Sequence, residues 1–159
     1  MPASAAGLIL NRMNTMTRHE RFNVFVSTGA PDSPMSEALG IRLESFAPGE
    51  VWARIEAKGG KLNNPLGALH GGVAASLVDH VMGLAMLSML SENEVFTTIE
   101  LKVNYLRAVK EDGPIRARGK ALKVGKTIGV IEGDVYDAAG ELLARAVCSC
   151  IRLPARPAR

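Results

Sequence analysis

Residues 63–80 read NNPLGALHGGVAASLVDH, and this stretch passes from a polar turn into an apolar helix that carries one carboxylate. We predict that the helix begins at Gly71 and runs to about Leu90. Asp79 lies nine residues after His70, among apolar neighbours. An isolated carboxylate in such surroundings costs several kcal/mol unless it is protonated or paired. An amide-rich helix start followed by an acid on an apolar helix is typical of an acyl-transfer or hydrolysis site.

Alternating apolar and polar residues predict strands on both sides of this helix. The predicted strands span residues 38–46, 50–57, 95–106, 115–124, 128–136 and 141–153. The last four are predicted to form a meander joined by short turns, so they are antiparallel. One long helix that is apolar nearly all round must be covered by that sheet. The sequence therefore predicts an α+β fold, a curved antiparallel sheet wrapped around one central helix, which is the hotdog arrangement.

The length of 159 residues corresponds to one domain. We predict a leader over residues 1–35 with at most one short amphipathic helix. The hotdog domain is expected over residues 36–153. Residues 154–159 contain proline and arginine and are expected to form a flexible basic tail.

Composition excludes several classes of protein. The net charge of +3 and an aromatic content of 4% argue against a nucleic-acid surface. The longest apolar run, 81–90, is too short to span a membrane, so we expect a cytoplasmic protein. Cys148 and Cys150 are two residues apart, and we expect them to be reduced and core-facing. A lone Cys-x-Cys lacks the other ligands of a zinc site, and we predict no metal and no cofactor.

The start of the helix and the acid within it are the candidate chemical groups. The first backbone N–H groups of a helix lack partners and favour negative charge. The Gly71 N–H could hold the oxyanion of a thioester or ester, an interaction worth about 2.7–4 kcal/mol in other enzymes. The alternative is a plain strand-to-helix turn. Asp79 is either a nucleophile or general base, or part of a narrow wet stripe with Ser76 and His80.

The spacing of these two groups has a consequence for assembly. Gly71 and Asp79 are eight residues apart, which corresponds to about 12 Å along a helix axis. An aspartate side chain cannot span that distance, so one chain cannot bring both groups to one carbonyl. A two-fold dimer solves this by placing the partner's acid beside Gly71. The sequence therefore predicts a homodimer with two equivalent sites at its interface.

The pattern Asn64-x5-His70-Gly71-Gly72-x6-Asp79 resembles that of hotdog acyl-CoA thioesterases of the phenylacetate-degradation type, a branch that includes a human thioesterase superfamily member. The resemblance extends from about residue 40 to residue 153. It implies that Asp79 acts as nucleophile or as base for water, and that the Gly71 N–H polarises the thioester carbonyl. It further implies that Asn64 positions the water or the thioester, and that His70 supports the thioester end.

Two later segments also resemble this family. The residues 98–107 are similar to its third-strand signature, which implies that Thr98 orients water, or Thr97 after a one-residue shift. The turn 125–127 matches one that the family uses near coenzyme A. The candidate coenzyme A contacts are therefore Arg107, Lys123, Gly125, Lys126 and Thr127. His80 departs from the small or polar residue common in relatives, and we assign it no chemistry.

The main hypothesis is an acyl-CoA thioesterase that forms a homodimer or a homotetramer and binds neither nucleic acid nor membrane. One alternative is a hotdog hydratase or dehydratase that uses His70 and Asp79 as an acid–base pair across the interface. Another is a non-catalytic acyl-CoA sensor with the same pocket. The sequence leaves the acyl group open, as well as the choice between nucleophilic and general-base hydrolysis.

Overall fold

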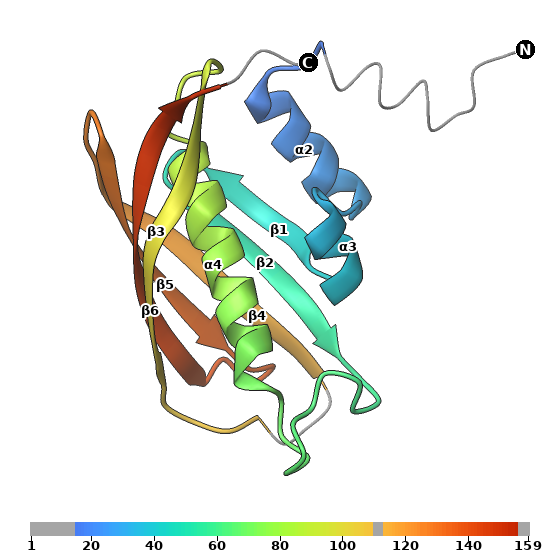
Figure 1. Ribbon diagram of the computed structural model, residues 1–159. Coiled ribbons are helices and arrows are strands. Elements are labelled where there is room, and N and C mark those ends of the chain that lie inside the picture. Colours follow the sequence, from blue (N-terminus) through green and yellow to red (C-terminus); the bar gives the residue numbers. More distant parts are fainter. Residues whose placement is uncertain (1–14, 110–112, 156–159) are drawn as a thin grey trace, which may run out of the picture.

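The computed structural model describes residues 15–109 and 113–155. Figure 1 shows one long helix lying against a curved sheet, with two shorter helices beside one sheet edge. The elements are α2 (Arg18–Thr28), α3 (Pro34–Leu39), β1 (Arg42–Ala47), β2 (Glu50–Ala57), α4 (Gly71–Leu87), β3 (Glu94–Tyr105), β4 (Gly113–Val124), β5 (Ile128–Tyr136) and β6 (Leu142–Pro154).

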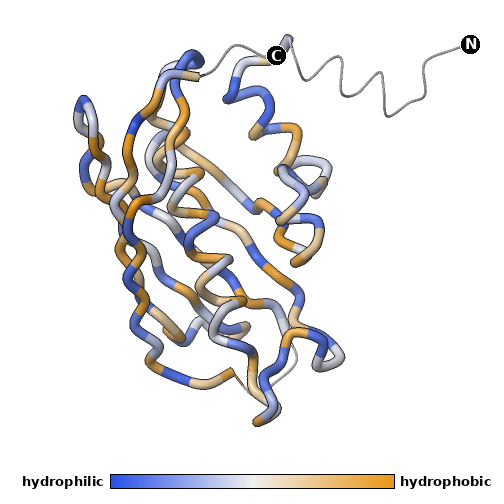
Figure 2. The backbone as a smooth tube through the Cα atoms, in the orientation of Figure 1, coloured by the Kyte–Doolittle hydropathy of each residue, from blue (hydrophilic) through white to orange (hydrophobic). Residues whose placement is uncertain are grey.

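The six strands form one antiparallel sheet in the order β1-β2-β4-β5-β6-β3. The central helix α4 packs against β2, β4, β5, β3 and β6. Figure 2 shows apolar segments along α4 and along the strands that face it, with polar segments at several of the turns. The predicted α+β hotdog fold is confirmed.

Glycines in the sheet bring α4 unusually close to the strands. A Cβ on Gly119 of β4 would collide with the backbone of Val81, and one on Gly133 of β5 would collide with Val78 and Met82. The residues under these contacts are fully buried: Val78, Val81 and Met82 are each 0% exposed. The backbone of α4 is therefore held directly on the sheet, which fixes the position of every side chain that the helix carries.

The predicted four-strand meander is wrong in one respect. Only β4, β5 and β6 follow one another as neighbours, while β3 pairs with β6 at the sheet edge and β2 pairs with β4. The connection from β3 to β4 therefore passes β6 and β5, which lie between these two strands in the sheet. Alternation within a strand reports which face is buried, but it carries no information about the neighbouring strand, which explains the error.

The region before the sheet also differs from the prediction. The predicted strand over residues 38–46 begins four residues later, because Ala38 and Leu39 close α3 and Gly40 ends it with a φ of 72°. Helix α2 lies within the predicted leader, whereas α3 crosses its predicted end at residue 35 and replaces the start of the predicted strand. The remaining residues of the leader, 1–14, and the end of the basic tail, 156–159, lie outside the described residues, while Pro154 closes β6.

A bulge in β3 changes which side chains face α4. Thr98 pairs with Cys150 and Glu100 with Ser149, so Ile99 is an extra residue on its strand. The predicted unbroken alternation over 95–106 placed Thr98 and Tyr105 on opposite faces. After the bulge, both turn toward α4, because one inserted residue reverses the alternation beyond it.

The helix α2 is attached to the end of α4 by one buried arginine. Arg18 is 9% exposed, and its guanidinium donates hydrogen bonds to the backbone carbonyls of Leu87, Leu90, Ser91 and Glu94 at 2.7–3.1 Å. The first three of these carbonyls belong to the end of α4 and the residues just after it, where regular helical hydrogen bonds run out and a cation is favoured. The leader is therefore an integral part of the packed domain.

We expect Arg18→Ala to lower the free energy of unfolding by about 2–3 kcal/mol, because buried carbonyls lose a charged donor. Urea unfolding measures the loss. The matched control is Arg21→Ala, which removes an exposed 3.5 Å ion pair with Glu92 and should change the stability by about 0.5 kcal/mol or less. Equal stability of the two variants would contradict the anchoring role.

Candidate functional site

The start of α4 leaves one backbone donor without a partner. His70 is the N-cap, and its Nδ1 accepts a hydrogen bond from the Gly72 N–H at 2.9 Å. The Val73 N–H donates to the His70 carbonyl at 2.9 Å. Within residues 15–109 and 113–155, no acceptor faces the Gly71 N–H. An unpaired amide at a helix N-terminus is suited to a developing oxyanion.

A groove of about 310 Å³ lies at the start of α4, and Asn64, Gly71, Tyr105 and Arg107 are among the residues that line it. The Oδ1 of Asn64 accepts hydrogen bonds from two backbone N–H groups of its own loop, at 2.9 and 3.2 Å. Its NH2 group is therefore the donor that it can offer a ligand. We call Asn64, His70 and the Gly71 N–H, which lie together at the start of α4, the α4 cradle.

The acid lies two turns further along α4. Asp79 is half-buried, and its Oδ1 accepts a hydrogen bond from the Thr98 hydroxyl at 3.2 Å. The same hydroxyl lies 3.9 Å from the Cys150 sulfur. Thr98 rather than Thr97 therefore contacts the acid; Thr97 is exposed, on the other face of β3. The structure brings Asp79 and Thr98 together as the sequence motif suggested.

The two cysteines, predicted to be reduced and core-facing, lie beside the pair of Asp79 and Thr98. Cys148 and Cys150 are free thiols, 1% and 0% exposed, with sulfurs 3.7 Å apart. The hydrogen bond with Cys150 and burial both raise the pKa of the Cys148 thiol. The core-facing, reduced state predicted for them agrees with the structure.

The structure keeps the α4 cradle and the acid apart within one chain. Gly71 and Asp79 both lie in α4, eight residues apart, and a rise of about 1.5 Å per residue separates them by about 12 Å along the axis. Asp79 does not line the groove. Each chain therefore carries two separate candidate half-sites, the cradle at the start of α4 and the acid in its middle.

The outer edge of β3 is unpaired among the described residues and carries exposed apolar side chains. Beyond β6, β3 pairs with no other strand among the described residues. Apolar side chains along it are exposed, with Ile99 at 57%, Leu101 at 37% and Tyr105 at 56%. An unpaired edge strand with exposed apolar side chains is a template for pairing with another chain.

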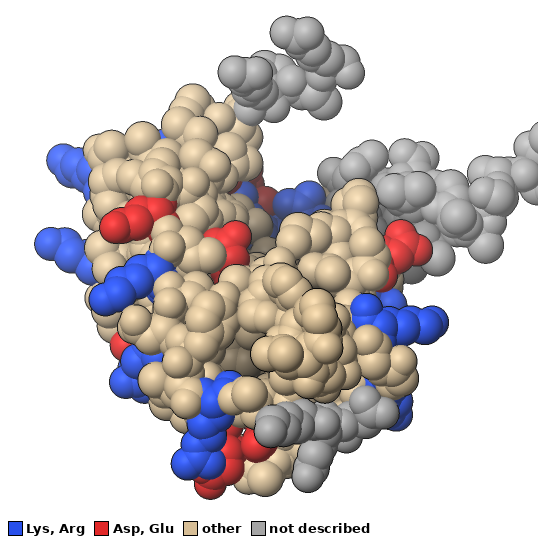
Figure 3. All heavy atoms as spheres, turned by 60° about the horizontal axis from the view of Figure 1, so that its bottom comes forward, with Lys and Arg blue, Asp and Glu red and all other residues tan. Residues whose placement is uncertain are grey.

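The candidate coenzyme A contacts fall into two groups at opposite ends of the molecule. Arg107 borders the groove at the start of α4 and forms an exposed 3.0 Å ion pair with Glu141. Lys123 and residues 125–127 lie at the β4–β5 turn, at the far end of the sheet (Figure 1). One chain does not bring them together. In Figure 3, Lys and Arg lie scattered around a largely uncharged surface, interleaved with acidic residues.

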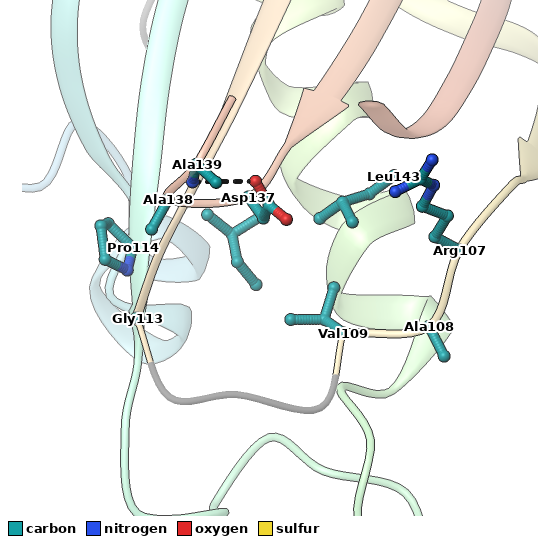
Figure 4. A pocket seen from close by; sticks show the side chains of 10 residues that line it. Arg107, Ala108, Val109, Gly113, Pro114, Asp137, Ala138, Ala139 and Leu143 are labelled. Atoms are coloured by element: carbon teal, nitrogen blue, oxygen red, sulfur yellow. Dashed lines mark hydrogen bonds between the residues drawn. The ribbon is translucent and has the colours of Figure 1, made fainter. Parts of the chain in front are cut away.

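A larger hollow of about 380 Å³ lies beside the groove, and Arg107, Val109, Asp137 and Leu143 are among its lining residues (Figure 4). Among the described residues that line it, the carboxylate is that of Asp137, whose Oδ1 is already engaged because it accepts hydrogen bonds from two N–H groups of the β5–β6 turn, both at 2.9 Å. None of the predicted catalytic side chains lines this hollow. The candidate site is therefore the smaller groove at the start of α4.

Two further searches concern metals and membranes. In the part of the chain that the structure describes, no cluster of three or more His, Cys, Asp or Glu side chains is arranged to hold a metal ion. Likewise, no helix in residues 15–109 and 113–155 has the length and apolar character needed to cross a membrane.

His80, to which the sequence assigned no role, forms a buried ion pair. Its Nε2 lies 3.0 Å from Oδ2 of Asp32, and the two side chains are 14% and 7% exposed. The pair joins α4 to the loop between α2 and α3. Burial alone would raise the pKa of the Asp32 carboxyl, but the hydrogen bond and the charge of His80, aided by Ser36, outweigh burial and hold that pKa below its ordinary value.

This lowered pKa predicts a pH-dependent contribution to stability. Unfolded chains bind the proton on Asp32 more readily than folded ones, so the contribution is fully present above about pH 4 and lost as the pH falls through the folded value. We expect Asp32→Asn to cost about 1–3 kcal/mol at neutral pH. In urea unfolding, the gap between variant and wild type should shrink below about pH 4. A gap that stays constant down to about pH 3 would contradict the assignment.

Sequence reasoning missed three contacts of this site. Tyr105 was assigned only to one face of a strand, yet its hydroxyl contacts the first turn of α4. Asp32 and Cys150 were not connected to His80 and Thr98. Alternation along β3 was the available signal for Tyr105, but the bulge at Ile99 reverses it, so the pattern placed Tyr105 on the face opposite Thr98.

Comparison with known proteins places these features in a family context. Residues 66–144 match the family model described as the thioesterase superfamily. Human acyl-coenzyme A thioesterase 13 is 30% identical over 135 residues, which cover 84% of this chain and 94% of the human protein. The 1,4-dihydroxy-2-naphthoyl-CoA hydrolase of Listeria monocytogenes is 29% identical over 115 residues, covering 72% of this chain and 92% of that enzyme.

Solved structures show the same architecture. The crystal structure of a thioesterase family protein from Silicibacter pomeroyi superposes with a TM-score of 0.74 at 26% identity, covering 84% of this chain and 98% of that one.

Proposed function

The chain belongs to the thioesterase superfamily, and from this premise we propose that it hydrolyses an acyl-CoA thioester to the free acid and coenzyme A. Its relatives are thioesterases and hydrolases of CoA thioesters. One observation carries the proposal to this chain: Gly71, whose N–H has no acceptor among the described residues, lines a groove together with Asn64. Two donors converging on one groove are suited to a thioester carbonyl whose oxygen gains charge during attack.

The proposed chemistry needs an acid and water but no metal. In the general-base route, Asp79 takes a proton from water as the water oxygen attacks the thioester carbon. In the nucleophilic route, the Asp79 carboxylate attacks that carbon itself, and water then hydrolyses the mixed anhydride. In both routes the Gly71 N–H holds the oxyanion, the carbon–sulfur bond breaks, and coenzyme A leaves as a thiolate that takes up a proton. Thr98 orients the carboxylate or the water.

In this proposal the acid comes from a second protomer, because the Asp79 side chain is too short to reach the cradle of its own chain. The separation of about 12 Å within α4 prevents one chain's Asp79 from serving its own cradle. Pairing along the exposed edge of β3 would bury Ile99 and Leu101 and join the half-sites of two chains. A closed two-fold dimer then has two equivalent sites. Association of two dimers into a tetramer is compatible with this arrangement.

Coenzyme A brings phosphates, and the same dimer explains how separated basic residues could share one substrate. Arg107 lies at the groove of one protomer, whereas Lys123, Gly125, Lys126 and Thr127 would come from the β4–β5 turn of the partner. Recognition by lysine and arginine is electrostatic, so binding should weaken as the salt concentration rises.

We place the protein in the cytoplasm.

A thiol-release assay over short, medium, long and aromatic acyl-CoAs tests the proposal. The aromatic substrates are included because the Listeria relative is a hydrolase of an aromatic CoA thioester. Release of free thiol with at least one class supports the thioesterase. Hydration of crotonyl-CoA without thiol release would point to the hydratase, and tight acyl-CoA binding without turnover would point to a sensor.

A further inference from the structure

We propose that Tyr105 is a positioning residue for the α4 cradle, a role that rests on the thioesterase function proposed above. The phenol O–H of Tyr105 donates a hydrogen bond to the Gly71 carbonyl at 3.0 Å. The peptide that begins at this carbonyl ends at the Gly72 N–H, which donates to His70 Nδ1 at 2.9 Å. Tyrosine, peptide and imidazole therefore form one continuous hydrogen-bond chain, in which each bond polarises the next.

The ring of Tyr105 also packs directly on the first turn of α4. A Cβ placed on Gly71 would lie 3.2 Å from Cζ of Tyr105, a contact tighter than ordinary packing. The glycine therefore lets the aromatic ring and the helix backbone meet. Because Tyr105 ends β3, and β3 also carries Thr98, the same strand contacts both the cradle and the acid of one protomer.

This hydrogen-bond chain determines which hydrogen-bond donor His70 can offer a ligand. Since Nδ1 accepts from the Gly72 N–H, a neutral imidazole carries its proton on Nε2. His70 is exposed, so the Nε2–H is available to a ligand at the start of α4. Tyr105 thus holds two donors in a fixed relation without contacting the reacting carbonyl itself. Positioned donors lower the barrier because they need no reorganisation when charge develops.

The test is Tyr105→Phe, which removes the O–H and keeps the ring. We expect kcat for thiol release to fall about five- to tenfold with KM within about twofold, because the cradle loses its alignment rather than its binding surface. Amide hydrogen exchange at Gly72 should become about five- to tenfold faster, since the bond to His70 is weakened. The melting temperature should stay close to that of the wild type.

Tyr136→Phe is the matched control. Tyr136 stacks on Trp52 at 5.9 Å between ring centroids, on the sheet face away from α4, and the substitution should leave kcat and Gly72 exchange unchanged. Unchanged kcat in Tyr105→Phe overturns the positioning role, and unchanged Gly72 exchange overturns the hydrogen-bond chain. If the wild type releases no thiol from any acyl-CoA, the proposed thioesterase function is wrong. Hydrogen exchange at Gly72 still reports whether the hydrogen-bond chain exists.

Discussion

Replacing Asp79 with asparagine should lower kcat for thiol release by about 10²- to 10⁴-fold, because the amide can neither attack the thioester nor accept a proton from water. The substitution keeps the size of the side chain. Its oxygen can still accept the hydrogen bond that Thr98 donates at 3.2 Å. The fold and the assembly should therefore remain intact, and the loss should appear in kcat rather than in KM.

Steady-state thiol release measures this loss, and gel filtration checks the assembly. Asp137→Asn is the matched control, because it makes the same chemical change in the β5–β6 turn, where the side-chain oxygen accepts two backbone hydrogen bonds. It should keep near-normal turnover. Near-normal turnover in Asp79→Asn itself would refute the role of the acid.

Mixing two inactive variants should restore activity if each site draws on two chains. The first variant is Asp79→Asn. The second is Gly71→Val, whose side chain would begin 3.2 Å from Tyr105 Cζ and obstruct the amide. A dimer with one chain of each kind has one site with both groups intact and one site with neither. Random reassembly makes about half of the dimers mixed, so about a quarter of the wild-type activity should return.

The experiment refolds the two variants together from denaturant, or co-expresses them, and compares thiol release with that of each variant alone. The control combines Gly71→Val with a chain that carries both substitutions, a mixture in which no site can be complete. Recovery in the first mixture and none in the control is the expected result. A mixture no more active than its parents would show that each site belongs to a single chain, and the reach argument would fall.

The positions that the sequence located in the candidate site depend on short-range geometry. The helix start at Gly71 and the position of Asp79 follow from local spacing, and the helix rise alone separates them. The contact between Thr98 and the acid was suggested by a family motif rather than by the physics of the strand. The pairing of His80 with Asp32 had no local signal, since the two residues lie 48 positions apart.

The sequence by itself determined the α+β class, the central helix, the approximate strands and the separation of the two half-sites, because periodicity and helix rise are local properties of the chain. Tertiary structure alone decided that β3 lies beside β6, that a bulge at Ile99 turns Thr98 and Tyr105 toward the same helix, and that α2 packs on β1 and is tied to the end of α4 by Arg18. Strand order and bulges depend on which distant surfaces fit together. That choice minimises the energy of the whole core, and no single segment of the chain records it.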